Sequence, residues 1–143
     1  MKNATVQYLS DYAYSQVLTA GHHAYLADEP HDQGGDDLGP GPYELLLWAL
    51  GSCTAMTLLM YARRHEWDVA GITIDLQHDR VYAHDRDPDG EGGRIEVIEQ
   101  TIHLKGNISE EQRARLEEIA RRCPVHKTLA GSVQISDEIV VVN

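Results

Sequence analysis

The sequence is poor in positive charge. Its 143 residues include 12 Lys and Arg against 23 Asp and Glu, which gives a formal net charge of −11. Proteins that bind nucleic acids neutralise phosphates with clustered Lys and Arg. The basic residues of the C-terminal third of the chain are instead interleaved with glutamates, a pattern typical of a solvated helix face. These glutamates are Glu110, Glu111, Glu117 and Glu118. Nucleic acid is therefore not an expected partner.

Cysteine and long apolar runs are also scarce. Two cysteines, Cys53 and Cys123, are too few for the disulfide framework of a secreted protein. No apolar run approaches the ~20 residues that a membrane span needs, and the first residues contain no apolar signal core. We expect a cytoplasmic protein without a membrane partner. In a reducing compartment the two thiols are expected to be either inert residues of the hydrophobic core or reactive residues of a functional site.

The length predicts one domain over residues 1–143. A compact monomer of this mass would expose about 7,400 Å². The order of predicted elements is mixed α and β, without the regular alternation of a Rossmann domain. The expected strands are residues 5–9, 14–19, 23–27, 72–78, 94–105, 132–135 and 138–142. Residues 80–82 are expected either to extend the strand over residues 72–78 or to bend it.

Two segments have strong helical signals. One begins at Pro42 and is apolar on nearly all sides, which predicts burial against a sheet or a partner subunit. The other begins with a capping box from Ser109 to Gln112 and continues toward Cys123, before Pro124 interrupts it. A short helix is expected over residues 126–130. Residues 28–41 are expected to form a mobile acidic loop, residues 85–93 a second loop, and a bulge is possible near residues 98–99.

Cys53 lies on an apolar stripe of the first helix. Taken alone, this position favours a packed core thiol. A reactive thiol needs a nearby cation, donor or helix N-terminus, and Cys53 is about eleven residues from the start of its own helix. Any activation must therefore come from outside that helix.

Cys123 has four potential cations around it, Arg121, Arg122, His126 and Lys127. They favour a thiolate if any of them points inward, and the alternative is that they face water. One Cys and one His are only half of a zinc site, so a metal site at Cys123 and His126 is a weak alternative and no metal or cofactor is predicted. His22, His23 and His31 are expected in a turn and a loop, and no catalytic triad or phosphate-binding loop is visible.

The motifs nevertheless form a recognisable pair. Pro42-Tyr-Glu-Leu-Leu and Gly51-Ser-Cys-Thr-Ala-Met56 precede Cys123-Pro-Val-His-Lys-Thr-Leu129, with Gly106-Asn-Ile-Ser-Glu-Glu-Gln112 leading to the second cysteine. Over nearly the whole chain, this pattern resembles the OsmC/Ohr family of peroxide-reducing proteins. The resemblance implies an α+β fold with antiparallel sheets packed around a long buried central helix, in an intertwined homodimer.

The resemblance also implies a mechanism and a set of roles. In peroxidase members a peroxidatic thiolate becomes a sulfenic acid, a resolving thiol condenses with it, and an external dithiol reduces the disulfide. By position, Cys53 would be peroxidatic and Cys123 resolving. Tyr43 and His126 are the expected binding residues. The expected partners are a second copy of the chain, an organic hydroperoxide and a dithiol.

Two departures from the family pattern concern the charges around the thiol. Peroxidase members carry an N-terminal Arg that steadies the thiolate, whereas no Arg precedes Arg63 here, so that role is vacant or filled by His22, His23 or His31. The family's glutamate directly follows the proline, whereas here Tyr43 holds that place and Glu44 follows. Glu44 lies ~13 Å along the helix from Cys53 and would act only across a dimer.

The predicted function is thiol-dependent reduction of hydroperoxides in oxidative-stress defence. The alternative is a protein of the same scaffold that has no enzymatic activity. Such a protein would bind a small hydrophobic ligand or sense oxidants through the same cysteines.

Overall fold

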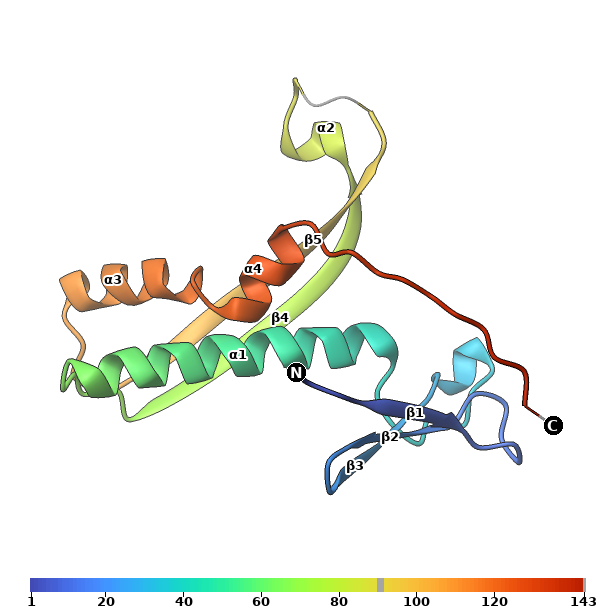
Figure 1. The fold of residues 1–143 in the computed structure, drawn as a ribbon. Helices are drawn as coiled ribbons and strands as arrows, with labels where there is room; N and C mark the ends of the chain where they lie inside the picture. The colour runs from blue at the N-terminus through green and yellow to red at the C-terminus, as the bar shows by residue number, and fades with distance from the viewer. Residues whose placement is uncertain (90–91, 143) are drawn as a thin grey trace. The chain divides into compact units, whose positions relative to one another are not determined.

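The computed structural model describes residues 1–89 and 92–142 (Figure 1). The chain divides into two compact units, Met1–Trp48 and Ala49–Asn143, which are described here one at a time. The prediction that residues 1–143 form one domain stays a prediction. The mixed α+β composition, with antiparallel sheets and one long helix, is confirmed.

The first unit is built on a three-stranded antiparallel sheet. β1 (Thr5–Tyr8), β2 (Gln16–Ala20) and β3 (His23–Ala27) follow one another in space as they do in the sequence. Gly21 begins the turn between β2 and β3 with a φ of 61°, a left-handed conformation that favours glycine. The predicted meander is therefore confirmed, with strand boundaries within two residues of those expected.

The acidic segment after β3 is organised around one buried carboxylate. Asp28 accepts hydrogen bonds from the Ser15 hydroxyl at 2.7 Å and from the Leu38 backbone amide at 3.2 Å. Burial raises the pKa of this carboxyl, but the hydrogen bonds, including one from the Glu29 amide, outweigh burial and lower it. A short 3-10 helix, η1 (His31–Gln33), lies within the segment. The segment expected to be a mobile loop is thus anchored at both ends.

Helix α1 (Pro42–Arg64) begins at the predicted residue, Pro42. Pro42 occupies the first helical position, where its missing N–H costs nothing. The Glu44 carboxylate accepts a hydrogen bond of 2.8 Å from the Gly41 amide, which closes the first turn. Arg63 and Arg64 place positive charge at the negative end of the helix.

The side chains of α1 are more apolar than their burial in one chain explains. An 18-residue stretch of the helix has a mean hydropathy of 1.6, yet only 28% of it is buried. By length and composition it meets the requirement for a membrane span, contrary to the expectation from the sequence, although the core helix of a globular protein meets it too. Large apolar side chains stay exposed along it, at Tyr43, Trp48, Met56 and Met60.

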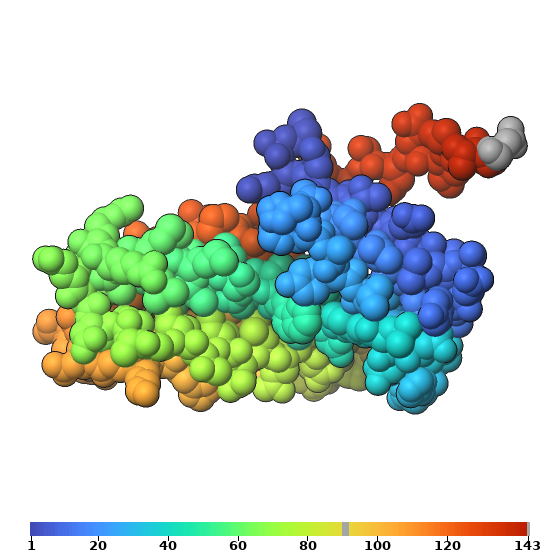
Figure 2. All heavy atoms as spheres, turned by 90° about the horizontal axis from the view of Figure 1, so that it is seen from below, coloured from blue at the N-terminus to red at the C-terminus, as the bar shows by residue number. Residues whose placement is uncertain are grey.

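In the second unit, α1 packs on a long two-stranded hairpin. β4 (Gly71–Tyr82) pairs antiparallel with β5 (Arg94–Lys105), and α2 (Ala83–Arg86) lies between them. Figure 2 shows the atoms of β4, in lime, directly alongside those of α1, in green. At Gly51 the helix comes so close that an added Cβ would lie 2.7 Å from Leu76 Cδ1. The missing side chain is what permits this approach.

The hairpin resolves one open expectation and corrects another. Of the two alternatives for residues 80–82, extension of the strand is confirmed: β4 pairs with β5 through Tyr82, and Glu96 on β5 binds His78 at 2.5 Å and Arg80 at 2.6 Å across the strands. The register runs through residues 98–99 without a bulge. Within the loop predicted over residues 85–93, residues 90–91 lie outside the described part of the chain.

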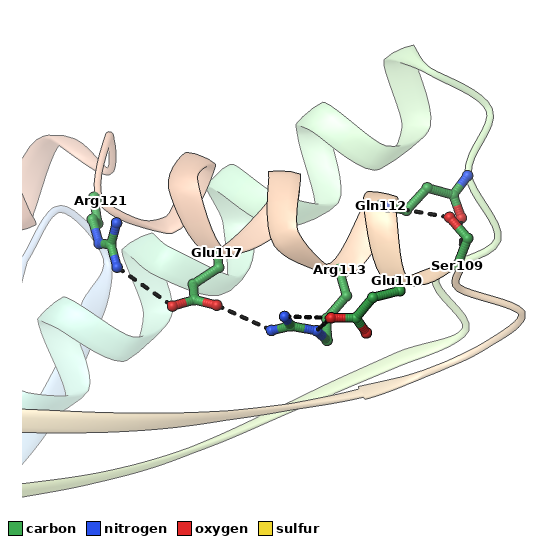
Figure 3. A network of polar contacts seen from close by, with 6 residues as sticks. All are labelled: Ser109, Glu110, Gln112, Arg113, Glu117 and Arg121. Carbon is green, nitrogen blue, oxygen red and sulfur yellow. Dashed lines mark hydrogen bonds and ion pairs between the residues drawn. The ribbon is translucent and has the colours of Figure 1, made fainter.

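Two short helices follow the hairpin. α3 (Glu110–Ala120) begins with the predicted capping box, in which Ser109 and Gln112 exchange side-chain-to-backbone hydrogen bonds (Figure 3). The same figure shows the exposed face of α3, where Arg113 binds Glu110 and Glu117. α3 ends before Cys123, which instead precedes α4 (Pro124–Ala130). The expectation that Cys123 lies on the second helix is therefore wrong, because Pro124 cannot continue α3 and starts a new helix.

The core of the second unit lies between α1, α3 and the hairpin. Leu58 of α1 and Leu116 of α3 are each 1% exposed, and Ile119 and Ala120 pack with them. Partly buried residues of both strands surround this cluster, including Ile72 and Ile102. The cluster fixes α3 against α1.

The C-terminal segment differs from the sequence prediction. Strands were expected at residues 132–135 and 138–142, but the described residues 132–142 form no regular structure. Their side chains are exposed, with Val133 at 55% and Ile139 at 91%. The β-branched composition that suggested strands is present, but no neighbouring strand in the described part of this chain pairs with it, and an unpaired segment cannot form a ladder.

Truncating the centre of this core should destabilise the protein. We expect Leu116→Ala to lower the free energy of unfolding by about 2–5 kcal/mol, because it removes buried methyl groups and leaves a cavity. Urea denaturation followed by circular dichroism measures the change. Ile139→Ala, in the exposed segment, is the control and should change stability by less than about 0.5 kcal/mol. Equal stability of both variants would contradict the described core.

Candidate functional site

The two cysteines occupy different environments. Cys53 projects from the middle of α1 and is half-buried, whereas Cys123 is completely buried at the N-cap of α4. Both are free thiols. The break between α3 and α4 turns the chain at this point and places the Cys123 side chain against α1.

The structure brings the two thiols close enough for each to shift the ionisation of the other. The thiol groups of Cys53 and Cys123 are hydrogen-bond partners. These residues lie on separate helices and come together because α3 packs on α1 through Leu58 and Leu116.

Neutral donors surround the Cys123 sulfur. The His126 backbone amide donates to it at 3.4 Å, and the Val125 amide and the Thr54 hydroxyl also hydrogen-bond with it. Burial raises the pKa of the Cys123 thiol, but these donors and the Cys53 thiol outweigh burial, so the pKa lies below its usual value. Cys123 is therefore the thiol that ionises first.

The Cys53 thiol is shifted in the opposite direction. Burial raises its pKa, and both the hydrogen bond with Cys123 and the negative charge that Cys123 can carry raise it further. The Val125 amide and the Thr57 hydroxyl oppose this rise without cancelling it. Cys53 thus retains its proton and donates it toward Cys123.

The basic side chains near Cys123 face water. Arg121, Arg122 and Lys127 are exposed, and Arg121 binds Glu117 at 3.4 Å. His126 contacts the sulfur through its backbone amide, as part of the first turn of α4. Of the two alternatives for this cluster, the structure therefore favours the solvated one for these three side chains.

Two predicted site residues lie in the first unit. Glu44 binds the amide of Gly41, so its observed contact is that of a helix cap. Tyr43 is 51% exposed on the first turn of α1. Both cysteines lie in the second unit, so the roles of Glu44 and Tyr43 at the site stay predictions.

The three N-terminal histidines lie at a turn and in the segment after β3, as expected from the sequence. His22 and His23 lie at the turn between β2 and β3, and a ring nitrogen of His31 lies 3.1 Å from the Gly35 carbonyl oxygen. Within the described residues, no group of three or more His, Cys, Asp and Glu side chains is arranged to hold a metal ion. Cys123 and His126 thus gain no further ligands there.

Three polar residues at the site were missed by sequence reasoning, Thr54, Thr57 and Gln100. Thr57 follows Cys53 by four residues, a spacing that places both on one helix face and was available as a signal. The hydroxyl oxygen of Thr54 lies 3.2 Å from Gln100 Oε1 on β5, a contact that depends on helix-to-strand packing. Gln100 also lines a cavity of about 300 Å³ with Leu58, Ile102, Leu104 and Leu116.

The match to known families can now be placed on this geometry. The OsmC family, described as OsmC-like protein, matches residues 34–137 and so includes both cysteines and both helices that carry them. This is well over half of the chain. The protein belongs to the OsmC family. No curated protein matches the chain at a significant level.

Solved structures of OsmC proteins share its fold. An OsmC-like protein of Mycoplasma pneumoniae has a TM-score of 0.71 at 21% identity, with 92% of this chain and 88% of that chain covered. The organic hydroperoxide resistance protein OhrB of Bacillus subtilis has a TM-score of 0.61 at 17% identity, with 92% and 91% covered. An organic hydroperoxide resistance protein OsmC of Legionella pneumophila scores 0.64 at 14% identity, with 92% and 90% covered.

The contact between the thiols predicts a coupled titration. Because Cys123 raises the pKa of the Cys53 thiol, Cys123→Ser should lower it and move the pH midpoint of Cys53 alkylation by iodoacetamide to lower pH. Alkylation rates across a pH series, read by mass spectrometry, measure this midpoint. Ser52→Ala, on the exposed side of α1, is the control. An unchanged or higher midpoint in Cys123→Ser would show that the thiols do not interact.

Proposed function

We propose that this OsmC protein reduces organic hydroperoxides with Cys53 and Cys123 and acts in oxidative-stress defence in the cytoplasm. The observation that carries this proposal is the hydrogen-bond contact between the two thiols. The names of the Bacillus subtilis and Legionella pneumophila relatives, which are hydroperoxide resistance proteins, support it. An external dithiol would supply the electrons.

Burial supports the division of roles. Cys123 is 0% exposed, so a peroxide cannot reach it, whereas Cys53 is half-buried and accessible. Cys53 is therefore the peroxidatic residue and Cys123 the resolving one. The apolar side chains beside Cys53 on α1, such as Met56, favour organic over inorganic peroxides.

The proposed reaction has three balanced steps. The Cys53 sulfur attacks a peroxide oxygen, the O–O bond breaks, and the products are a Cys53 sulfenic acid and an alkoxide that takes up a proton to become the alcohol. The Cys123 thiolate then attacks the Cys53 sulfur, an S–S bond forms, and hydroxide leaves and is protonated to water. Finally an external dithiol is oxidised while the protein disulfide is reduced to two thiols.

The contact between the thiols also provides the proton acceptor for the first step. Cys123 ionises first and receives the hydrogen bond of the Cys53 thiol. Transfer of that proton to Cys123 gives a Cys53 thiolate for the attack. Cys123 then passes the proton to the departing alkoxide, which becomes the alcohol, and is again a thiolate for the resolving step. Since this chain has no Arg before Arg63, the activation relies on neutral donors, and slow turnover is expected.

We further propose that the protein acts as a homodimer. The longest helix, α1, is apolar over an 18-residue stretch of which only 28% is buried. Side chains of this helix such as Met56 and Met60 lie in water. Exposed apolar surface of this extent is typical of a subunit that buries it against a partner.

The cavity beside Gln100 supports a second candidate function. Its walls are largely apolar, from Leu58, Ile102, Leu104 and Leu116, with Arg113 and Glu117 also lining it. Its volume of about 300 Å³ is at the lower end of the range for small-molecule sites. A protein that kept both thiols reduced in excess peroxide would be better explained as a binder of small hydrophobic ligands.

Peroxide turnover tests the proposed function directly. With cumene hydroperoxide and dihydrolipoamide, we expect the parent protein to consume peroxide and Cys53→Ser to fall to the rate of the buffer, since it lacks the attacking sulfur. After one equivalent of peroxide, mass spectrometry should find a Cys53–Cys123 disulfide in the parent and a sulfenic acid in Cys123→Ser. Two free thiols in the oxidised parent would contradict the proposal, and a disulfide that forms only once would favour oxidant sensing.

Glu44 provides a test of the site across the dimer. Glu44→Gln keeps an oxygen that can accept the Gly41 hydrogen bond but removes the charge. If Glu44 serves the partner's thiol, the variant should reduce cumene hydroperoxide at least about tenfold more slowly, with unchanged stability to urea. Turnover at the parental rate would show that Glu44 acts only as a helix cap.

A further inference from the structure

Thr54 contacts more polar groups than one hydroxyl can serve at once. Its side chain is 0% exposed, and its oxygen lies 2.9 Å from the Leu50 carbonyl oxygen and 3.2 Å from Gln100 Oε1. It also hydrogen-bonds with the buried sulfur of Cys123. A hydroxyl has one hydrogen to donate, so these acceptors compete for it.

The alternatives differ in what each acceptor loses. The Leu50 carbonyl already accepts the helical N–H of Thr54, so losing the hydroxyl leaves it satisfied. Gln100 is half-buried and its amide lines the cavity, where water can replace the hydroxyl. The Cys123 sulfur is completely buried and has no access to solvent. Of the three acceptors, the Cys123 sulfur is therefore the one that can least replace the Thr54 donor.

We propose that Thr54 is a positioning residue for the resolving step, with a hydroxyl that reorients between the Leu50 carbonyl and the Cys123 sulfur. When Cys123 is a thiol, its S–H donates to Thr54 Oγ1 and the hydroxyl donates to Leu50. When Cys123 is a thiolate, the hydroxyl hydrogen turns to the sulfur in a charge-assisted hydrogen bond. Only a hydrogen moves, so the buried side chains need not repack.

Gln100 completes this arrangement from β5. Its terminal amide oxygen accepts from the Thr54 hydroxyl at 3.2 Å, and a turn of the amide would present a donor to the hydroxyl oxygen instead. With the Val125 and His126 amides, Thr54 forms a shell of neutral donors around the sulfur. This shell stands where a cation would otherwise be needed to stabilise a buried thiolate.

The inference deepens the proposed function and rests on it only for the chemical step. In that step the Cys123 thiolate attacks the sulfur of the Cys53 sulfenic acid. The S–S bond forms as the S–O bond breaks, Cys123 is oxidised and Cys53 is reduced. The hydroxide that leaves is protonated to water. By stabilising the thiolate, Thr54 raises the fraction of protein that can take this step at neutral pH.

A titration tests the inference without any peroxide. In the Cys53→Ser background only Cys123 can form a thiolate, and its ultraviolet absorbance across a pH series reports the midpoint. We expect Thr54→Val, which keeps the shape but lacks the hydroxyl, to move this midpoint to higher pH, and Thr54→Ser to restore it. Gln100→Met should give a smaller move in the same direction. A Thr54→Val midpoint equal to that of its background would overturn the inference.

The matched control is Thr128→Val. Thr128 makes the same type of hydrogen bond to the carbonyl four residues earlier, at 3.0 Å from the Pro124 oxygen, but it is exposed. It should leave the midpoint unchanged. If Thr54→Val does not fold, Thr54→Ala and Gln100→Met in the same titration provide the answer.

A rapid-mixing experiment gives the kinetic consequence. After one equivalent of cumene hydroperoxide, Thr54→Val in the two-cysteine protein should form the disulfide about tenfold more slowly than the parent, so that sulfenic acid accumulates. The deficit should shrink as pH rises, which loss of structure alone would not produce. If the parent consumes no peroxide, the proposed function fails, and the titration still decides the role of Thr54.

Discussion

The packing of α3 on α1 is the constraint on which the candidate site depends. Leu58 and Leu116 bury one another, and Ala120, at the end of α3, continues the same contact. Cys123 follows Ala120 by only three residues and directly precedes Pro124, the first residue of α4. The short connection keeps Cys123 close to α1. The distance between the two sulfurs is thus set by hydrophobic packing a short way along the chain.

That packing also explains why the two thiols differ in acidity although they touch. Cys123 ends one helix and caps the next, so free backbone amides point at its sulfur. Cys53 lies in the middle of α1, where the nearby amides of the same helix already donate to helical carbonyl oxygens. Its neighbours can supply only a side-chain hydroxyl, from Thr57, and an amide from the facing helix. Cys123 is therefore the more acidic thiol because it lies at a helix N-terminus, and Cys53 the less acidic one because it lies in the middle of a helix.

Much of the fold was predictable because its signals are local. Proline at the first turn of α1, the capping box of α3 and the alternation of residues 94–105 each act within a few residues, and each is confirmed. The strands predicted at residues 132–135 and 138–142 were wrong, since β-branched residues describe a segment that can pair but do not supply its neighbour. For residues 80–82 the sequence left extension and bending of the strand open, and pairing with β5 decides for extension.

In the candidate site, too, the features with a local sequence signal were predictable and those that depend on tertiary packing were not. The two cysteines were found through motifs, and the contact between them required only that both helices meet. The shell of donors could not be found in this way. Thr54 and Gln100 are 46 positions apart, and neither threonine nor glutamine as a residue type indicates a functional site. The four charges beside Cys123 pointed to cations at the sulfur, but exposed Arg and Lys side chains gain more from water than from a buried thiol.

The unpaired C-terminal segment has a consequence for how the protein behaves in solution. Residues 139–142 read Ile-Val-Val-Val, without charge or proline, and their side chains are exposed. Short segments of this kind are templates for aggregation between molecules. Asp137 and Glu138 directly precede them, and the net charge of −11 keeps copies apart. The acidic composition thus acts as a colloidal safeguard, one that weakens as carboxylates are protonated or screened by salt.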